Sequence, residues 1–249
     1  NKGKPITTIC VSLPESTDGR YSQELADFLH SRHYHIIKSE QEYLDSIPET
    51  IYTVESYDET SVRASTPQLE LGKSAKKIIG PGVVIVGDYS DEICGGYVEN
   101  HLAPTTWDFL QLGYQRIRDI IYFDGQRADR CLSDQGLEAR FPFADHRFIR
   151  LYLSIDPELR RPRYGIEKYL LRKAFAGKNI IPDSILWRPK EAFSDGISGL
   201  KRSWYIIIKE FVDQHITDED YHQSQINHEY TFNPPQSKEG LYYRRLFEQ

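Results

Sequence analysis

The stretch GPGVVIVGDYSDE, residues 80–92, decides the fold of this chain. Gly80-Pro81-Gly82 ends a helix, and the β-branched run VVIV at 83–86 predicts a strand buried on both faces. Strands of that kind form parallel sheets whose two faces are covered by helices. Polar residues follow immediately, and ligands of such sheets bind beyond the carboxyl ends of the strands. The stretch therefore predicts a parallel sheet with a functional loop at 87–92.

The residues before this stretch predict further strands that alternate with helices. PITTICVSL, residues 5–13, is β-branched and bounded by Gly3 and Pro14, and a shorter strand is predicted at 34–37. The helices that we expect here cover 21–32, a segment that a Ser39/Glu42 capping box opens and that Pro48 splits before Val54, and a segment from Thr66-Pro67 to Ile79. Strands that alternate with helices indicate a doubly wound α/β unit.

The rest of the chain is predicted to be mostly helical. Apolar residues recur at helical spacing over 107–121, and further helices are predicted at 146–154, 165–176 and 200–215. No repeat or low-complexity linker interrupts the pattern. The fold class is therefore predicted to be α/β, a doubly wound parallel sheet followed by a helical half, in one domain over residues 1–249.

Charge and composition exclude several classes of function. The formal net charge is −6, which argues against a nucleic-acid binder, although basic residues cluster at Arg160–Arg163 and Arg244–Arg245 and leave a small anionic ligand open. No apolar run approaches the roughly 20 residues of a membrane helix, and no signal peptide opens the chain. We therefore expect neither nucleic acid nor a membrane as a partner.

The cysteines indicate a reducing compartment. Cys10, Cys94 and Cys131 are odd in number, widely spaced and without a CxxC pair, which makes zinc binding by thiolates improbable and a cytoplasmic location the better prediction. The chain contains no methionine, even at position 1. We therefore expect it to be an excerpt of a longer protein or a processed form.

The first candidate site is the loop GDYSDE at 87–92. Asp88, Asp91 and Glu92 follow the predicted strand within five residues, and carboxylates so placed can hold Mg²⁺ facing nucleotide phosphates. The alternative is that Ser90, Asp91 and Glu92 only cap a helix and complement its dipole. The spacing alone leaves both interpretations open.

Two further stretches carry candidate residues. Lys190 in RPKEAFSDG, residues 188–196, could neutralise charge on a phosphate leaving group, with a solvated loop as the alternative. Arg63, in SYDETSVRASTP at 56–67 between two predicted helices, could bind a carboxylate, with a surface ion pair to Asp58 or Glu59 as the alternative. His33 and His35 alternate along a predicted strand and are interpreted as packing or surface residues.

Six stretches together resemble the synthetase domain of B-type asparagine synthetases. The resemblance runs from about Pro5 to Glu248, and the order in which the six stretches follow one another is specific to the family. The stretches are SYDETSVRASTP, GDYSDEICGGY, GLEARFPFADHRF, GIEKYLLRKAF, WRPKEAFSDG and SKEGLYYRRLFE. The resemblance implies a sheet of the ATP-pyrophosphatase type.

The resemblance also implies an activity and its partners. Such enzymes hydrolyse glutamine in an N-terminal glutaminase domain and pass ammonia to the synthetase domain. There, ATP and Mg²⁺ activate aspartate as β-aspartyl-AMP, pyrophosphate leaves, and ammonia displaces AMP to give asparagine. The implied ligands are thus ATP, Mg²⁺, aspartate and ammonia, and a homodimer stays open.

By position, the resemblance assigns roles to nine residues. Asp88 matches an acidic residue near the acyl-adenylate and ammonia, Asp91 a magnesium ligand, Lys190 a lysine that stabilises pyrophosphate, and Lys168 is placed nearby. The residues that match nucleotide contacts are Val11, Val86 and Gly87, and those that match aspartate contacts are Thr60 and Arg63.

The chain also departs from the family pattern. The family usually has SGEGSDE where this chain has VGDYSDE, so Asp88 is one methylene shorter than the expected glutamate and Tyr89 replaces a glycine. A misplacement on this scale can cost roughly 10²-fold in rate. The family's SGGxDS pyrophosphatase loop, its central first strand and the glutaminase domain have no counterpart here. We therefore expect the 249 residues alone to be inactive.

Three hypotheses remain open at this point. The first is a genuine glutamine-dependent asparagine synthetase. The second is a related ATP-dependent ligase, such as a β-lactam synthetase-like enzyme, against which Thr60 and Arg63 argue. The third is a binding or scaffold protein that descends from a synthetase and has lost catalysis, for which the altered segment at 86–89 argues.

Overall fold

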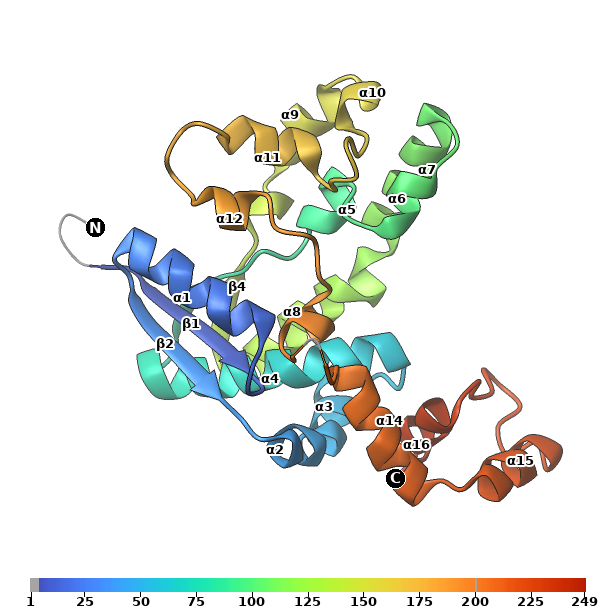
Figure 1. Ribbon diagram of the computed structural model, residues 1–249. Helices are drawn as coiled ribbons and strands as arrows, with labels where there is room; N and C mark the ends of the chain where they lie inside the picture. The colour runs from blue at the N-terminus through green and yellow to red at the C-terminus, as the bar shows by residue number, and fades with distance from the viewer. Residues whose placement is uncertain (1–4, 200) are drawn as a thin grey trace.

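Four short strands form two parallel pairs. The computed structural model describes residues 5–199 and 201–249, coloured along the chain in Figure 1. Strand β1 (Thr7–Ser12) pairs with β2 (Arg32–Ile37), and β3 (Gly82–Ile85) pairs with β4 (Leu137–Arg140). The registers run from Thr7 opposite Arg32 and from Gly82 opposite Leu137.

The α/β class with parallel strands is therefore confirmed, but one continuous sheet is not observed. Within the described residues, the two pairs are separate two-stranded sheets, because β1 and β3 are not hydrogen-bonded to each other. Both pairs nevertheless pack on the same helices: Ile9 of β1 and Val84 of β3 join the core cluster around Ala75 and Leu132.

Sixteen α-helices in the described ranges surround these strands. In Figure 1, α5–α7 and α9–α12 lie on one side of the strands, and α14–α16 lie at the opposite end of the molecule. The helices are α1 (Thr17–Leu29), α2 (Glu40–Asp45), α3 (Ile47–Val54), α4 (Glu59–Ile79), α5 (Ser90–Cys94), α6 (Val98–Leu102), α7 (Thr106–Asp119), α8 (Asp124–Ser133), α9 (His146–Ser154), α10 (Pro157–Arg160), α11 (Tyr169–Phe175), α12 (Asp183–Leu186), α13 (Phe193–Gly196), α14 (Trp204–His215), α15 (Asp218–Ile226) and α16 (Lys238–Phe247). Two 3₁₀ turns, η1 (Ile120–Tyr122) and η2 (Pro142–Ala144), complete the order.

Local signals set several helix ends correctly. The Ser39 hydroxyl accepts a hydrogen bond from the Glu42 backbone N–H, and the Glu42 carboxylate accepts one from the Ser39 backbone N–H. The capping box at the start of α2 is therefore confirmed. The helical segment is interrupted at Ser46, between α2 and α3. Pro48 lies in the first turn of α3, where a backbone N–H would have no acceptor within the helix, so its absence costs no hydrogen bond.

The predicted start of α4 at Thr66-Pro67 is wrong. The helix begins at Glu59 with Asp58 as its N-cap, so Pro67 lies in its interior. A proline there leaves the carbonyl four residues earlier without its helical donor. That carbonyl belongs to Arg63, and it accepts a hydrogen bond from the Trp204 indole Nε1 at 3.1 Å. The tertiary contact compensates for the proline, which the local pattern could not show.

The predicted burial of the strand at 83–86 is also wrong. Val83 and Ile85 are 55% and 76% exposed, whereas Val84 and Val86 pack inward. One face of this pair is therefore open, and its inward residues contact the layer that contains α4 and α8. Strand β4 was missed because it is only four residues long and its outward residues, Glu138 and Arg140, are charged.

Helix α1 covers a face of the first pair, where two histidines of β2 are hydrogen-bonded to β1. His35 Nε2 lies 2.8 Å from Ser12 Oγ, and His33 Nδ1 lies 2.9 Å from Thr8 Oγ1. Gly19 of α1 packs against the His35 ring so closely that a Cβ would overlap it, which explains a glycine in the first turn of a helix. Of the two alternatives left open by the sequence, packing and surface exposure, these contacts favour packing.

This packing predicts a loss of stability in mild acid. Burial, and then the neighbouring His35, lowers the pKa of His33 below its ordinary value of 6.5. The unfolded chain therefore binds this proton more readily, and the free energy of unfolding should fall as the pH drops below that value. We expect urea unfolding midpoints measured between about pH 7.5 and pH 5.5 to fall less for His33→Gln than for wild type. His222→Gln, at an exposed position, is the control and should follow wild type.

Candidate active site at the carboxyl end of β3

The loop after β3 is held in a conformation that its tyrosine does not favour. Tyr89 precedes α5 with φ at 73°, in the left-handed region. Its ring packs edge-on against Phe141 at 4.9 Å between centroids. The ring contact secures the tyrosine at a position where a glycine would meet no backbone strain.

Two substitutions separate the strain from the packing. Tyr89→Ala removes the ring and keeps a Cβ at positive φ, whereas Tyr89→Gly removes both. We expect the glycine variant to be more stable than the alanine variant by about 1–2 kcal/mol in urea unfolding, because a left-handed non-glycine residue carries that strain. Equal stability of the two variants would show that the loop relaxes to negative φ once the ring is gone.

Asp91 meets two lysines from distant parts of the chain. Lys168 Nζ lies 2.6 Å from Asp91 Oδ1, and Lys190 Nζ lies 3.8 Å from Oδ2. Lys190 also lies over the Tyr97 ring, 5.4 Å from its centroid. Gly96 forms the back of this cluster, since a Cβ there would overlap the Asp91 carboxylate. The structure thus brings together three predicted residues, Asp91, Lys168 and Lys190.

Asp88 lies on the same loop and faces another partner. Its Oδ1 accepts from Arg127 Nη2 at 3.2 Å, and 15% of its side chain remains exposed. Burial raises the pKa of Asp88 above its ordinary value, while the Arg127 guanidinium opposes that rise. A carboxylate in such a setting accepts a proton more readily than a solvated aspartate does.

Glu92, the third carboxylate of the loop, points elsewhere. It is 5% exposed and accepts a hydrogen bond from the Tyr97 hydroxyl, which lies 2.9 Å from Asp124 Oδ2. Burial raises the pKa of Glu92 to about 7. The expectation of three clustered carboxylates is therefore corrected to two, because the Glu92 side chain is buried between helices and points away from Asp88 and Asp91.

Asp91 fits a metal ion only when a nucleotide accompanies it. The described residues contain no group of three or more His, Cys, Asp or Glu side chains arranged for a metal ion. Mg²⁺ in nucleotide sites typically takes one or two carboxylates and fills its other positions with phosphate oxygens and water. Asp91 could supply one carboxylate ligand of this kind, and phosphate oxygens and water would have to fill the other positions.

The predicted nucleotide contacts are divided between two strands. Gly87 is exposed on the loop beside Asp88, and Val86 is half-buried at the end of β3. Val11 is 4% exposed and belongs to the main core with Tyr43 and Ile47, so its side chain packs inside the protein. Its adenosine role stays a prediction.

Arg63 has a protein carboxylate as its partner. Its Nε and Nη2 donate to the two oxygens of Glu239 at 2.7 and 2.6 Å, and Glu59 accepts at 3.3 Å. The ion pair with Glu59 that was considered for Arg63 is therefore present, and the buried Glu239 of α16 adds a second, shorter one. Thr60 lies one turn before Arg63, exposed to solvent.

Arg63 still borders an open pocket. A pocket of about 510 Å³ is lined by Arg63, Ser194, Asp195, Ser203 and Tyr205. It is formed partly by the RPKEAFSDG stretch, which also carries Lys190. One cation, one carboxylate and three hydroxyls are groups that can contact both ends of an amino acid.

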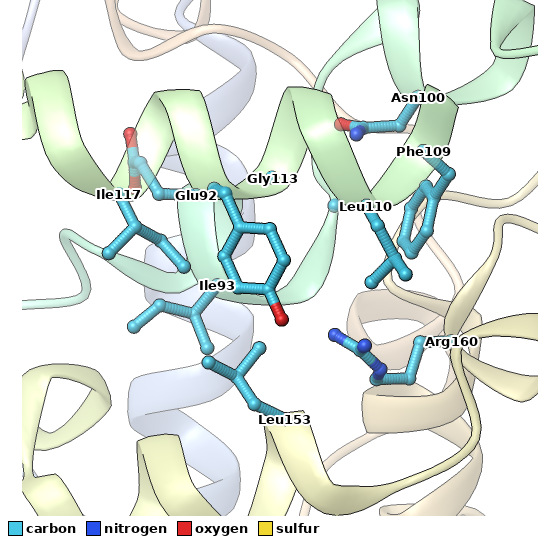
Figure 2. Close-up of a pocket in the computed structure, with 11 residues that line it drawn as sticks. Glu92, Ile93, Asn100, Phe109, Leu110, Gly113, Ile117, Leu153 and Arg160 are labelled. Carbon is cyan, nitrogen blue, oxygen red and sulfur yellow. The ribbon is translucent and has the colours of Figure 1, made fainter. Parts of the chain in front are cut away.

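Figure 2 shows a second pocket, which does not belong to this site. It lies among α5, α7 and the α9–α10 segment, with Glu92 and Arg160 on opposite sides. Its volume is about 10 Å³, room for about one water molecule.

The buried cysteines offer no alternative chemistry, since burial raises the pKa of both Cys94 and Cys131 to about 12.

Comparisons with known proteins identify the family of this chain. The family model "Asparagine synthase" matches residues 1–119 and 104–249, which together span the chain. That decides the family. The chain belongs to the asparagine synthase family.

Relatives within this family share two fifths of the sequence. The chain is 40% identical over 244 residues to the glutamine-hydrolyzing asparagine synthetase of Homo sapiens and 40% identical over 243 residues to that of Rattus norvegicus. Each alignment covers 98% of this chain and 43% of the relative. The chain thus spans less than half the length of these relatives. None of its described helices is long and apolar enough to cross a membrane.

Four residues around the site were not predicted from the sequence. Arg127, Asp124 and Tyr97 surround Asp88 and Glu92, and Glu239 holds Arg63. Glu239 lies within the matched stretch SKEGLYYRRLFE, but nothing in a single sequence joins it to a residue 176 positions away.

Proposed function

We propose that this chain is the synthetase part of a glutamine-hydrolysing asparagine synthetase, which converts aspartate to asparagine with ATP and ammonia. The observation that carries the proposal is the cluster of Asp91, Lys168 and Lys190 at the carboxyl end of a parallel strand, in a member of the asparagine synthase family. That position is where open α/β sheets bind nucleotides.

The cluster supports the first half of the reaction. An oxygen of the aspartate β-carboxylate attacks the α-phosphorus of ATP, and the bond to the β-phosphate breaks to release pyrophosphate. Lys168 and Lys190 would neutralise the charge that develops on this leaving group. Asp91 would hold Mg²⁺, which when bound shields the phosphate charge.

Asp88 supports the second half. The ammonia nitrogen attacks the β-carbonyl carbon of β-aspartyl-AMP, and the bond between that carbon and the AMP oxygen breaks. The nitrogen must lose a proton, and we assign its acceptance to Asp88. The nucleoside would lie against Val86 and Gly87, with Val11 beneath, and the amino acid would lie in the pocket beside Arg63, near Thr60.

We further propose that the two strand pairs are parts of one doubly wound sheet of the ATP-pyrophosphatase type. Both pairs are parallel and pack on a shared helical layer around Ala75 and Leu132. An additional strand between β1 and β3 would join the two pairs into one sheet. The exposed face that carries Val83 and Ile85 would still need a further layer to cover it. The glutaminase part, named in the relatives, would supply ammonia. We propose that the protein acts in the cytoplasm, as a homodimer.

The test is product formation by the full-length protein that carries this chain. With ATP, Mg²⁺, aspartate and ammonia, we expect asparagine, AMP and pyrophosphate in equal amounts. Turnover of ATP with a β-amino acid precursor but not with aspartate would favour the β-lactam synthetase-like alternative. Absence of turnover, together with absence of Mg-ATP binding in calorimetry, would favour a scaffold that has lost catalysis.

A further inference from the structure

Arg127 lies buried behind the Asp88 loop. The residue belongs to α8 and is 7% exposed. Its Nη1 donates to Gln68 Oε1 at 2.8 Å, and its Nη2 donates to Asp124 Oδ1 at 2.7 Å and to Asp88 Oδ1 at 3.2 Å. The guanidinium thus connects helix α4, its own helix and the loop after β3.

A buried cation needs compensation, and Arg127 obtains it without Asp88. Asp124 lies one turn earlier on α8 and forms the shorter ion pair. The Tyr97 hydroxyl lies 2.9 Å from the other oxygen of Asp124, and Gln68 fixes the opposite side of the guanidinium. Because these partners already hold the arginine, its remaining contact can fix the Asp88 carboxylate.

We propose that Arg127 is the positioning residue that fixes the Asp88 carboxylate, and that Asp124 and Tyr97 hold Arg127 in place for this task. The proposal rests on the role of Asp88 in the proposed function only for its catalytic consequence. The contact uses one carboxylate oxygen and leaves 15% of the Asp88 side chain exposed, so the acid stays accessible to a substrate.

The charges around Asp88 indicate what the contact does. Arg127 and Asp124 face it from α8, and Asp91 faces it from α5. Burial and both aspartates favour the protonated acid, whereas Arg127 favours the carboxylate. Without the arginine, Asp88 would hold its proton to higher pH and would be a carboxylate, able to accept a proton, over a narrower pH range.

A carbon-13 NMR titration of the Asp88 carboxyl in this chain tests the proposal. The signal is assigned by its absence in Asp88→Asn. Arg127→Gln is expected to raise the Asp88 midpoint by about one pH unit or more, because a nearby opposite charge typically lowers a carboxyl pKa by 1–3 units. Arg127→Lys, which keeps the charge, should raise it less.

Arg130 offers a matched control on the same helix. It binds the Val54 carbonyl and Glu55, and so faces away from Asp88. Arg130→Gln should leave the Asp88 midpoint unchanged. An equal midpoint in wild type and Arg127→Gln, or an equal shift in both glutamine variants, would overturn the proposal.

A second measurement covers the case in which Arg127→Gln does not fold. In the folded wild type, the nitrogen-15 guanidinium signal of Arg127 should shift when Asp88 is replaced by asparagine, while the Arg130 signal should not. An unchanged Arg127 signal would overturn the proposal.

Activity separates this proposal from the proposed function. In the full-length protein, the acid limb of the pH profile of kcat should shift in Arg127→Lys by the same amount as the titration midpoint of Asp88. If the midpoint moves and the acid limb does not, Arg127 still positions Asp88, but Asp88 is not the proton acceptor.

Discussion

Replacing Lys190 with methionine is expected to lower kcat for asparagine formation by the full-length protein about 10²–10³-fold, the usual effect of removing one preorganised group that faces developing charge. Lys190 lies 3.8 Å from Asp91 and over the Tyr97 ring, at the position proposed for the leaving pyrophosphate. Because the charge on pyrophosphate grows as the α–β bond breaks, kcat should fall more than the KM for ATP rises.

Lys178→Met is the matched control for this effect. Lys178 is an exposed lysine in the loop after α11, whereas the lysines that pair with Asp91 are Lys168 and Lys190. Steady-state kinetics of this variant should match wild type. If Lys190→Met changed only the KM for ATP, the lysine would bind the nucleotide uniformly and would not stabilise the leaving group.

Replacing Arg63 with methionine is expected to destabilise the fold by about 3–5 kcal/mol, the cost of leaving a buried charge without its partner. The Glu239 side chain is 7% exposed and would lose both of its hydrogen bonds to Arg63. This ion pair joins α4 to the C-terminal helix α16, so the effect should appear in the global urea unfolding transition.

The double variant Arg63→Met with Glu239→Leu distinguishes the pair from the packing. Replacing both partners by apolar residues removes the unpaired charge and should recover most of the lost stability. Lys209→Met, which breaks an exposed ion pair with Asp213, serves as the surface control and should leave the transition unchanged. Destabilisation of the double variant as severe as that of Arg63→Met would show that the guanidinium stem, and not its charge, stabilises the helix contact.

Local patterns predicted those parts of the fold that depend on neighbours along the chain. The strands at β1, β2 and β3 and the capping box of α2 follow from composition and spacing over a few residues. The start of α4 did not, because Pro67 signals a helix N-terminus locally while the Trp204 indole, 141 residues away, allows the helix to pass through it. Strand β4 was missed because its alternation is short and its outward side chains are charged.

The candidate site divides in the same manner. Asp88 and Asp91 follow directly from their position after β3, and the family resemblance supplied Lys168 and Lys190. The partners Arg127 and Glu239 could not be predicted, because each pairs with a carboxylate or guanidinium far away in the chain. Periodicity places a residue on a face of a helix, but it does not say which distant charge that face will meet.

Isotope exchange between pyrophosphate and ATP tests the central claim most directly, because it reports the activation of aspartate without requiring ammonia. The full-length protein should incorporate labelled pyrophosphate into ATP only when aspartate and Mg²⁺ are present, and Asp91→Asn should abolish the exchange. No aspartate-dependent exchange in the wild type, or exchange at the wild-type rate in Asp91→Asn, would contradict the assignment of this site.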